Sequence, residues 1–264
     1  MPEGLLLPHP PIIVPEVGGK RREEATKTIS AFEEAVEELS NEEIDLMISV
    51  GPHGEIDWNQ VTVDQAETLK GDLSRFNARD VSLELESANE FAEKLIKAFE
   101  VRAEYDVKGI KSGNIDHGIM VPAYFLNKAG LAKDIPWLKI NIAFWQADKL
   151  YEFGKIVMEE ASKNYENPKV IISGDLSHKI NHDSPAGYSP AGSKFDQRLV
   201  NDLKTANLSS LLNYDESFLE EAGECGYRPL MVGLGLLDGR WNKIEVKSYE
   251  APYGVGYAVA GFYR

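Results

Sequence analysis

The stretch Val170-Ile171-Ile172-Ser173-Gly174-Asp175-Leu176-Ser177-His178 decides the expected fold. It opens as a short run of apolar, β-branched residues and ends in small and polar residues that include Asp175 and His178. This pattern predicts a buried strand that stops and presents a histidine just after its end. In an α/β protein such a position lies at the carboxyl edge of the sheet, where ligands commonly bind.

Two other histidines follow short apolar runs in the same way. Leu5–Leu7 precede Pro8-His9, and Ile44–Val50 precede Gly51-Pro52-His53. A single histidine is more often a structural or surface residue than a functional one. Because parallel strands share one carboxyl edge, however, we expect His9, His53 and His178 to converge there.

The other two of the five histidines differ in their surroundings. His117 lies in the glycine-flanked segment Gly113–Gly118, and we expect it in a loop, where functional groups are often placed. His182 lies in a polar stretch with Pro185 and is expected to be a surface loop residue.

Strand and helix patterns alternate along most of the chain. Apolar residues at spacings of three and four predict a helix over 22–39, and Ser87 with Glu90 predicts a capping box for a helix through Phe99. Strict alternation over 81–86 predicts a half-exposed strand. The expected fold is therefore a single-domain α/β sandwich over 1–264, with a central mixed or largely parallel sheet flanked by helices.

Composition excludes several classes of protein. The chain has 28 Lys plus Arg and 43 Asp plus Glu, a net charge of −15, which disfavours nucleic acid as a partner. No apolar run approaches the roughly 20 residues that span a bilayer, so no membrane association is expected. A single cysteine, Cys225, allows no intrachain disulfide, and the N-terminus has no basic signal-peptide region. A cytoplasmic location is expected.

Two histidines and one carboxylate can hold a divalent metal and leave coordination positions open. This donor set is typical of non-haem Fe(II) oxygenases, and with a bound water it also serves zinc hydrolases. The residues alone do not choose the carboxylate among 43 acidic side chains.

Several segments, taken together and in order, carry a family resemblance. They are Pro8-His9-Pro10-Pro11 with Pro15-Glu16-Val17-Gly18, Gly51-Pro52-His53-Gly54, Asp116-His117-Gly118, Ser173-Gly174-Asp175-Leu176-Ser177-His178 and Glu224-Cys225-Gly226-Tyr227-Arg228. The chain thus resembles the class III extradiol ring-cleavage dioxygenases of the LigB type, the family of the catalytic subunit of protocatechuate 4,5-dioxygenase. The closing segment over 248–257 is similar to a branch of that family related to the Memo proteins.

The resemblance implies an enzyme that cleaves a small aromatic diol with O2, beside rather than between the two hydroxyls. It implies Fe(II), with zinc as an alternative, held by His9, His53 and an acidic residue for which Glu224 is our choice. Cys225 is the alternative third ligand, because Memo-like relatives place a cysteine beside that glycine. A cysteine ligand would make zinc or copper more plausible.

The resemblance also implies roles for three further residues. His178 would be the acid/base that moves a proton to and from the diol. His117 would polarise the substrate or oxygen, and Asp175 would orient His178 or cap the turn before it.

Two other functions remain open. One is a Memo-like metal-binding protein without ring cleavage, and the other is a zinc hydrolase on the same site. Ligation by Glu224 would favour the oxygenase, and ligation by Cys225 the Memo-like protein. Arg228 is a candidate for binding a substrate carboxylate, or it pairs with an acid such as Glu224. The oligomeric state is open, and a homodimer is the commonest arrangement to expect.

Overall fold

A mixed eight-stranded sheet forms the centre of the protein. In the computed structural model, which describes all residues 1–264, the strand order is β6-β3-β7-β2-β8-β1-β10-β9. Strands β7, β2, β8 and β1 run parallel, whereas β3 joins β7 and β10 joins β1 in antiparallel fashion. The strands are β1 Pro2–Leu7, β2 Leu46–Gly51, β3 Val61–Asp64, β6 Val107–Ile110, β7 Trp137–Asn141, β8 Pro168–Ser173, β9 Lys243–Glu250 and β10 Tyr257–Tyr263.

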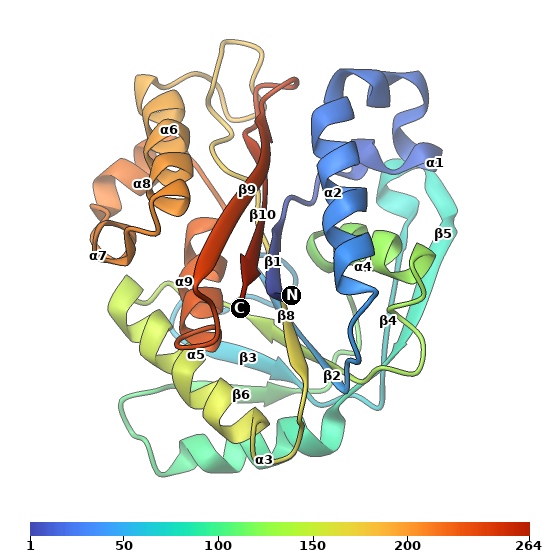
Figure 1. The fold of residues 1–264 in the computed structure, drawn as a ribbon, viewed down its shortest axis with the longest axis vertical. Coiled ribbons are helices and arrows are strands. Elements are labelled where there is room, and N and C mark those ends of the chain that lie inside the picture. Colours follow the sequence, from blue (N-terminus) through green and yellow to red (C-terminus); the bar gives the residue numbers. More distant parts are fainter.

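Helices cover both faces of this sheet (Figure 1). Helices α2 and α4 pack on one face, and α3, α5 and α9 on the other, while α6 lies against β9. The α-helices are α1 Pro15–Gly18, α2 Thr26–Leu39, α3 Asn89–Glu100, α4 His117–Lys128, α5 Ala147–Ala161, α6 Pro190–Lys204, α7 Leu208–Leu211, α8 Glu216–Ala222 and α9 Tyr227–Leu236. The expected α/β sandwich with a mixed sheet is confirmed.

The central strands are buried on both faces, which is why their sequences are continuous apolar runs. Successive side chains alternate between two cores: Ile172 of β8 packs with α9 residues, whereas Ile171 packs with the α2 and α4 side. Each such side chain contributes about 1.5–3 kcal/mol through burial. The carboxyl ends of β1, β8 and β2 are thereby held in fixed register.

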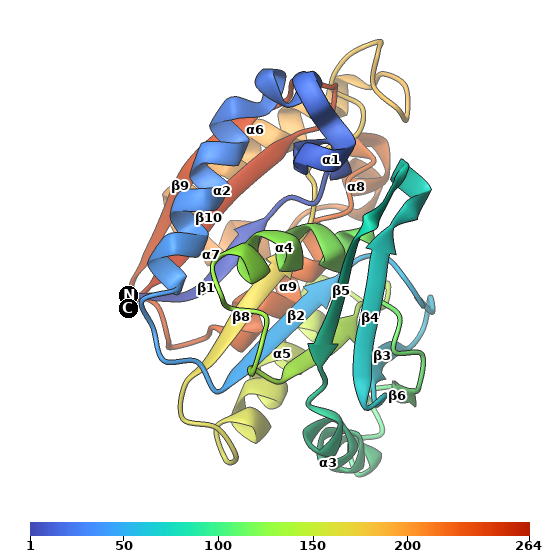
Figure 2. The ribbon, with the colours of Figure 1, turned by 90° about the vertical axis from the view of Figure 1, so that its right-hand side faces the viewer.

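A two-stranded antiparallel sheet stands beside the main sheet (Figure 2). It consists of β4 Thr68–Leu73, the 3₁₀ turn η3 Ser74–Phe76 and β5 Ala78–Glu86, and we call residues 68–86 the arm. Leu69 and Leu85 of the arm join the same core as α4. Sequence patterns did not predict β4 or β6, because TLKGDL and VKGI are short, polar and interrupted by glycine.

Two expected helix starts are wrong. The helix expected over 22–39 begins at Thr26, because residues 19–25 form the 3₁₀ helix η2. The expected capping box of Ser87 and Glu90 is absent: Ala88 is the N-cap residue of α3 and no side chain caps the helix. Ser87 instead forms a β-bridge with Trp137, so its backbone belongs to the sheet.

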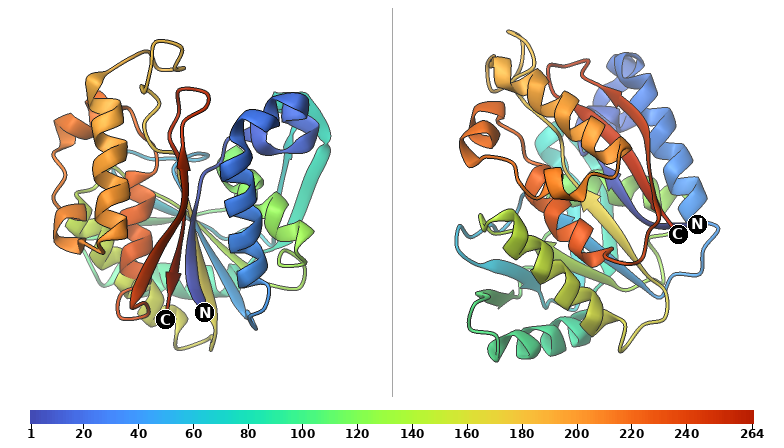
Figure 3. Two further views of the ribbon diagram at one scale, coloured as in Figure 1. Left: turned by 45° about the horizontal axis from the view of Figure 1, so that its top comes forward. Right: turned by 60° about the vertical axis from the view of Figure 1, so that its left-hand side comes forward.

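The chain ends lie next to each other at one end of the sheet (Figure 3). Pro2 pairs with Tyr263 because β1 and β10 are antiparallel neighbours. No helix has the length and apolar character that crossing a bilayer requires.

Candidate metal centre

The neighbouring strands β1, β8 and β2 bring two histidines into contact. His9 follows β1 and His53 follows β2, and their Nε2 atoms lie 3.1 Å apart. His117 joins them, so that one nitrogen from each of the three rings lies within 4.8 Å of the others. This cluster of His9, His53 and His117 can hold a metal ion.

His9 is buried, and its partners set its tautomer. Its Nδ1 lies 2.9 Å from Ser173 Oγ, and that hydroxyl donates its proton to the carbonyl of Gly118. Ser173 Oγ must therefore accept from an Nδ1–H of His9, which leaves Nε2 as a bare lone pair directed at the cluster. The backbone N–H of His9 donates to Asp175 Oδ1 at 2.8 Å.

The expectation that His117 lies in a loop is wrong, because His117 is the first residue of helix α4. Asp116 caps this helix by accepting from Gly118 N at 2.7 Å, and the His117 ring stacks on His53 at 4.7 Å. The preceding loop is held by a buried ion pair in the sheet. Lys139 Nζ bonds to the Asn114 carbonyl and to Asp64, whose carboxylate accepts from Gly113 N.

The segment before α9 delivers Cys225 to the cluster. Gly174 and Gly226 lie back to back, and a Cβ on Gly174 would sit 2.3 Å from the Gly226 Cα. Only glycines allow this approach, and it places Cys225 Sγ 3.6 Å from His9 Nε2 and 3.6 Å from His178 Nε2.

Glu224 points elsewhere. Its Oε2 accepts from Tyr227 N at 2.6 Å at the start of α9, and its Oε1 lies 3.9 Å from Arg228. Arg228 is paired with acids, because its guanidinium also bonds to Glu216. The structure thus brings Cys225, rather than the carboxylate of Glu224, into contact with the histidines.

The strand end at 173–178 places Asp175 and His178 beside the cluster. Asp175 bonds to His9, whereas His178 turns its Nε2 toward Cys225. Its loop is held by Asp196, which accepts from Ser177 N at 2.9 Å and from the Tyr249 hydroxyl. His182, as expected, is exposed in a loop, where it packs on Tyr188.

Sequence reasoning missed two of these residues. Nothing in the sequence marked Ser173 as functional apart from its position at the end of strand β8, in the segment Ser173–His178. Asp196 carried a signal: it falls three, four and seven residues before Leu199, Val200 and Leu203, on the buried face of α6. A carboxylate on an apolar helix face needs buried partners.

Burial sets the protonation of the site. Desolvation lowers the pKa of His9 well below its usual value and that of His53 to about 3, with further lowering from neighbouring histidines. Desolvation also lowers the pKa of His178. These imidazoles are therefore neutral near pH 7 and offer lone pairs, which metal coordination requires.

Burial has the opposite effect on the acids. It raises the pKa of Asp175 to about 6, that of Glu224 to about 7 and that of the Cys225 thiol well above its usual value. Cys225 can therefore be a thiolate near pH 7 only with a compensating positive charge beside it.

Two pairs of donors have the separation that ligands of one metal ion require. Metal–ligand bonds of about 2.0–2.3 Å, typical of zinc sites, place two atoms on one ion about 3–4 Å apart. The separations of 3.1 Å between His9 and His53 and 3.6 Å between His9 and Cys225 lie in that range.

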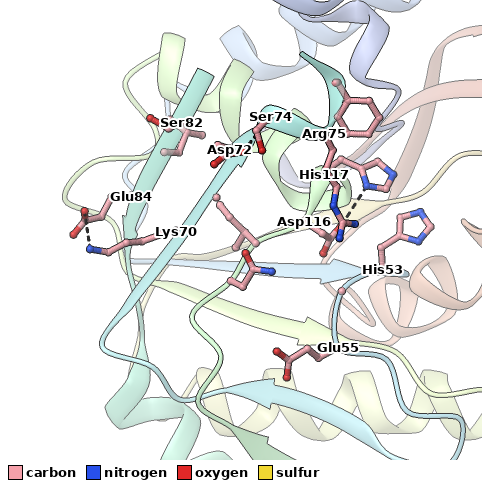
Figure 4. Close-up of a pocket in the computed structure, with 16 residues that line it drawn as sticks. His53, Glu55, Lys70, Asp72, Ser74, Arg75, Ser82, Glu84, Asp116 and His117 are labelled. Atoms are coloured by element: carbon pink, nitrogen blue, oxygen red, sulfur yellow. Dashed lines mark hydrogen bonds and ion pairs between the residues drawn. The ribbon is translucent and has the colours of Figure 1, made fainter. Parts of the chain in front are cut away.

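A pocket of about 1130 Å³ opens onto the cluster (Figure 4). His53 and His117 line one end of it, and the arm runs from Lys70 and Glu84 at the far end to Phe76, whose ring lies 5.5 Å from the His117 ring. A pocket of this size accommodates a small aromatic molecule.

Comparisons with known proteins agree with this picture. A family model described as the catalytic LigB subunit of aromatic ring-opening dioxygenase matches residues 3–263. The chain is also similar to Protein CA_C1420 of Clostridium acetobutylicum, with 37% identity over 262 residues. That alignment covers 96% of this chain and 56% of the relative, so the chain spans about half the relative's length.

A solved structure shows the same fold. The crystal structure of the uncharacterized protein JW3007 from Escherichia coli K12 superimposes with a TM-score of 0.65 and 17% identity. The match covers 99% of this chain and 100% of that one.

Proposed function

The chain belongs to the family of catalytic LigB subunits of aromatic ring-opening dioxygenases, and from this membership we propose that it is a non-haem Fe(II) dioxygenase. Its substrates would be O2 and a catechol-like diol, with the ring opened beside the two hydroxyls. The observation that carries the proposal is the cluster of His9, His53 and His117 at the end of an open pocket.

Residues of this chain would hold the iron. His9 and His53 supply two ligands, and Cys225 is better placed as the third than Glu224, whose carboxylate bonds to Tyr227. When bound, Fe(II) would supply the electron transfer between diol and O2 that their direct reaction lacks.

His178 and His117 would handle protons and orientation. His178 Nε2 faces the cluster and can accept a proton from a diol hydroxyl, then return it to the product. His117 lines the pocket from the start of α4 and can donate to a substrate oxygen. The Asp175 carboxylate positions His9 by accepting a hydrogen bond from the backbone N–H of His9.

One observation favours a second candidate function. The contact of Cys225 with His9 supports the hypothesis that the chain is a Memo-like metal-binding protein that does not cleave rings. A thiolate ligand also makes zinc or copper stronger competitors for the site.

Anaerobic reconstitution with Fe(II) tests both candidates. We expect about one iron per chain, O2 uptake with at least one diol from a panel of catechols, and a yellow ring-opened product. Stoichiometric iron without turnover of any diol would reject the dioxygenase and leave the Memo-like protein.

Matched variants make the result specific. His53→Ala should lower iron affinity by more than about 100-fold, because losing a direct ligand costs more than losing a supporting residue. His182→Ala, in an exposed loop, should bind iron normally. Equal iron content in both variants would show that the cluster is not the metal site.

A further inference from the structure

A proline inside α4 leaves one backbone carbonyl without its helical donor. In an α-helix the carbonyl of residue 118 accepts from the N–H of residue 122. Residue 122 is Pro122, which has no N–H, so Gly118 lacks that partner. A buried carbonyl needs a donor, and Gly118 has one from outside the helix, because the Ser173 hydroxyl at the end of β8 donates to it.

This hydrogen bond determines what Ser173 can offer to His9. The hydroxyl has one proton, and the Gly118 carbonyl can only accept it. The Ser173 oxygen also lies 2.9 Å from His9 Nδ1, so the ring nitrogen must be the donor in that contact. Ser173 is 0% exposed and His9 is 1% exposed, so water does not compete for either group. The missing N–H of Pro122 is thus connected to the tautomer of His9 through one carbonyl and one hydroxyl.

Gly118 is held beside the other two histidines of the cluster. It directly follows His117, and its N–H donates to Asp116 Oδ1 at 2.7 Å. A Cβ on Gly118 would lie 3.3 Å from His53 Cδ2, so the His53 ring packs against its backbone. The carbonyl that orients the Ser173 hydroxyl therefore belongs to the same rigid unit as His53 and His117.

The other tautomer of His9 would not bind a metal ion. A neutral imidazole has one ring proton, and a proton on Nε2 occupies the lone pair that faces the cluster. Asp175 Oδ2 lies 3.9 Å from Nε2 and is an acceptor near that proton. Without the Ser173 oxygen, a proton on Nδ1 would be buried with no acceptor, which is unfavourable. Loss of the hydroxyl should therefore move the proton from Nδ1 to Nε2.

We propose that Ser173 is a positioning residue that holds His9 in the tautomer with a free Nε2 lone pair and thereby sets the metal affinity of the site. Ser173 acts through His9, since its hydroxyl bonds to Nδ1 and not to the metal-facing nitrogen. This inference rests on the proposed function for the metal alone. It holds for iron or zinc and does not depend on ring cleavage.

Nitrogen NMR of the metal-free full chain measures the tautomer directly. Long-range proton–nitrogen spectra of histidine-labelled protein distinguish a proton on Nδ1 from one on Nε2, and His9→Gln identifies the His9 signals. We expect the proton on Nδ1 in the wild type. In Ser173→Ala we expect most of the His9 population to carry it on Nε2.

Competition with a chromophoric chelator measures the affinity for Zn²⁺ and, under anaerobic conditions, for Fe(II). Ser173→Ala should bind each metal about 10- to 100-fold more weakly, and Ser173→Thr, which keeps the hydroxyl, should restore most of the affinity. Ser49→Ala is the matched control, because Ser49 is a buried serine of the neighbouring strand β2 whose hydroxyl bonds to the Leu138 carbonyl. It should keep the wild-type affinity. Should Ser173→Ala fail to fold, Ser173→Cys, whose thiol is a weak donor and acceptor, takes its place.

The outcomes separate Ser173 from the rest of the proposed function. A proton on Nε2 in the wild type, an unchanged tautomer in Ser173→Ala, or equal metal affinities of these two proteins would each overturn the role of Ser173. An equal loss of affinity in Ser49→Ala would also overturn it, because the effect would then come from packing. A tautomer change with weaker metal binding, together with no O2 uptake from any diol, would support Ser173 and reject ring cleavage.

Discussion

Two walls of the same pocket are built in different ways. The sheet-edge wall is lined by His53, and behind it lie His9, Ser173 and Asp175, which are buried and joined by hydrogen bonds. The arm is a two-stranded sheet whose pocket side carries exposed charged residues such as Asp72 and Arg75. Groups that bind metal and move protons need fixed geometry, whereas groups that select a substrate tolerate solvent and variation.

The ion pairs on the two sides make the same contrast. Lys139 and Asp64, behind the His117 loop, have side chains that are 0% exposed. Lys70 and Glu84, on the arm, have side chains that are 59% and 60% exposed. The division predicts large effects from changes at the sheet edge and small effects on the arm.

The largest effect is expected from His178→Ala. In the proposed dioxygenase His178 accepts the diol proton, so its removal should lower kcat roughly 10³-fold, within the range for general acid–base catalysis, while iron content stays near that of the wild type. Steady-state O2 uptake and metal analysis measure the two quantities, with His182→Ala as the control. Loss of iron in His178→Ala would place His178 among the ligands instead.

Lys139→Met should destabilise the fold by about 3–5 kcal/mol. It leaves the Asp64 carboxylate buried without its counter-ion, and it frees the loop that leads to His117. Urea unfolding monitored by fluorescence gives the change in the free energy of unfolding. The double variant Asp64→Asn/Lys139→Met should recover part of the lost stability. A Lys139→Met variant within about 1 kcal/mol of the wild type would contradict the stabilising role of the buried ion pair.

Asp196→Asn should flatten the pH dependence of stability. Burial raises the pKa of Asp196 to about 7 in the folded protein, above the ordinary value of about 4 in the unfolded chain. The folded state therefore binds the extra proton between about pH 4 and pH 7. The stability from this group is full below pH 4 and is lost as the pH rises to 7.

The asparagine keeps an acceptor for Ser177 N–H but does not titrate. Over that window the free energy of unfolding should fall less in the variant than in the wild type, by on the order of 2 kcal/mol. Glu224 and Asp175 are present in both proteins and cancel in the difference. Asp183→Asn, in an exposed loop, is the control, and parallel stability curves for wild type and Asp196→Asn would disprove the buried proton.

The sheet edge was the more predictable of the two walls. Apolar runs that end in His9, His53 and His178 predicted three strand ends at one edge, because buried parallel strands have a strong pattern and a fixed topology. The contact between Cys225 and His9 depends on the close approach of Gly174 and Gly226, which no local pattern reports. The sequence therefore could not predict that Cys225, rather than Glu224, contacts the histidines.

The arm escaped prediction for a related reason. Its strand β4 is short and half exposed, so its side chains show little hydrophobic contrast, and its position depends on packing against α4. In the sequence Arg75 is likewise one arginine among many charged residues. Its place in the pocket lining beside His117 depends on the fold.

The smallest effect is expected from Lys70→Ala on the arm. Its ion pair with Glu84 is solvent-exposed, so its loss should change the free energy of unfolding by less than about 0.5 kcal/mol. The backbone of Lys70, which bonds to Gly113 and Ile115, is unaffected by the substitution. Urea unfolding of Lys70→Ala beside Lys139→Met compares an exposed and a buried lysine in one protein. A loss above about 1.5 kcal/mol in Lys70→Ala would mean that this exposed ion pair holds the arm firmly in place, and the arm would then take part in positioning His117.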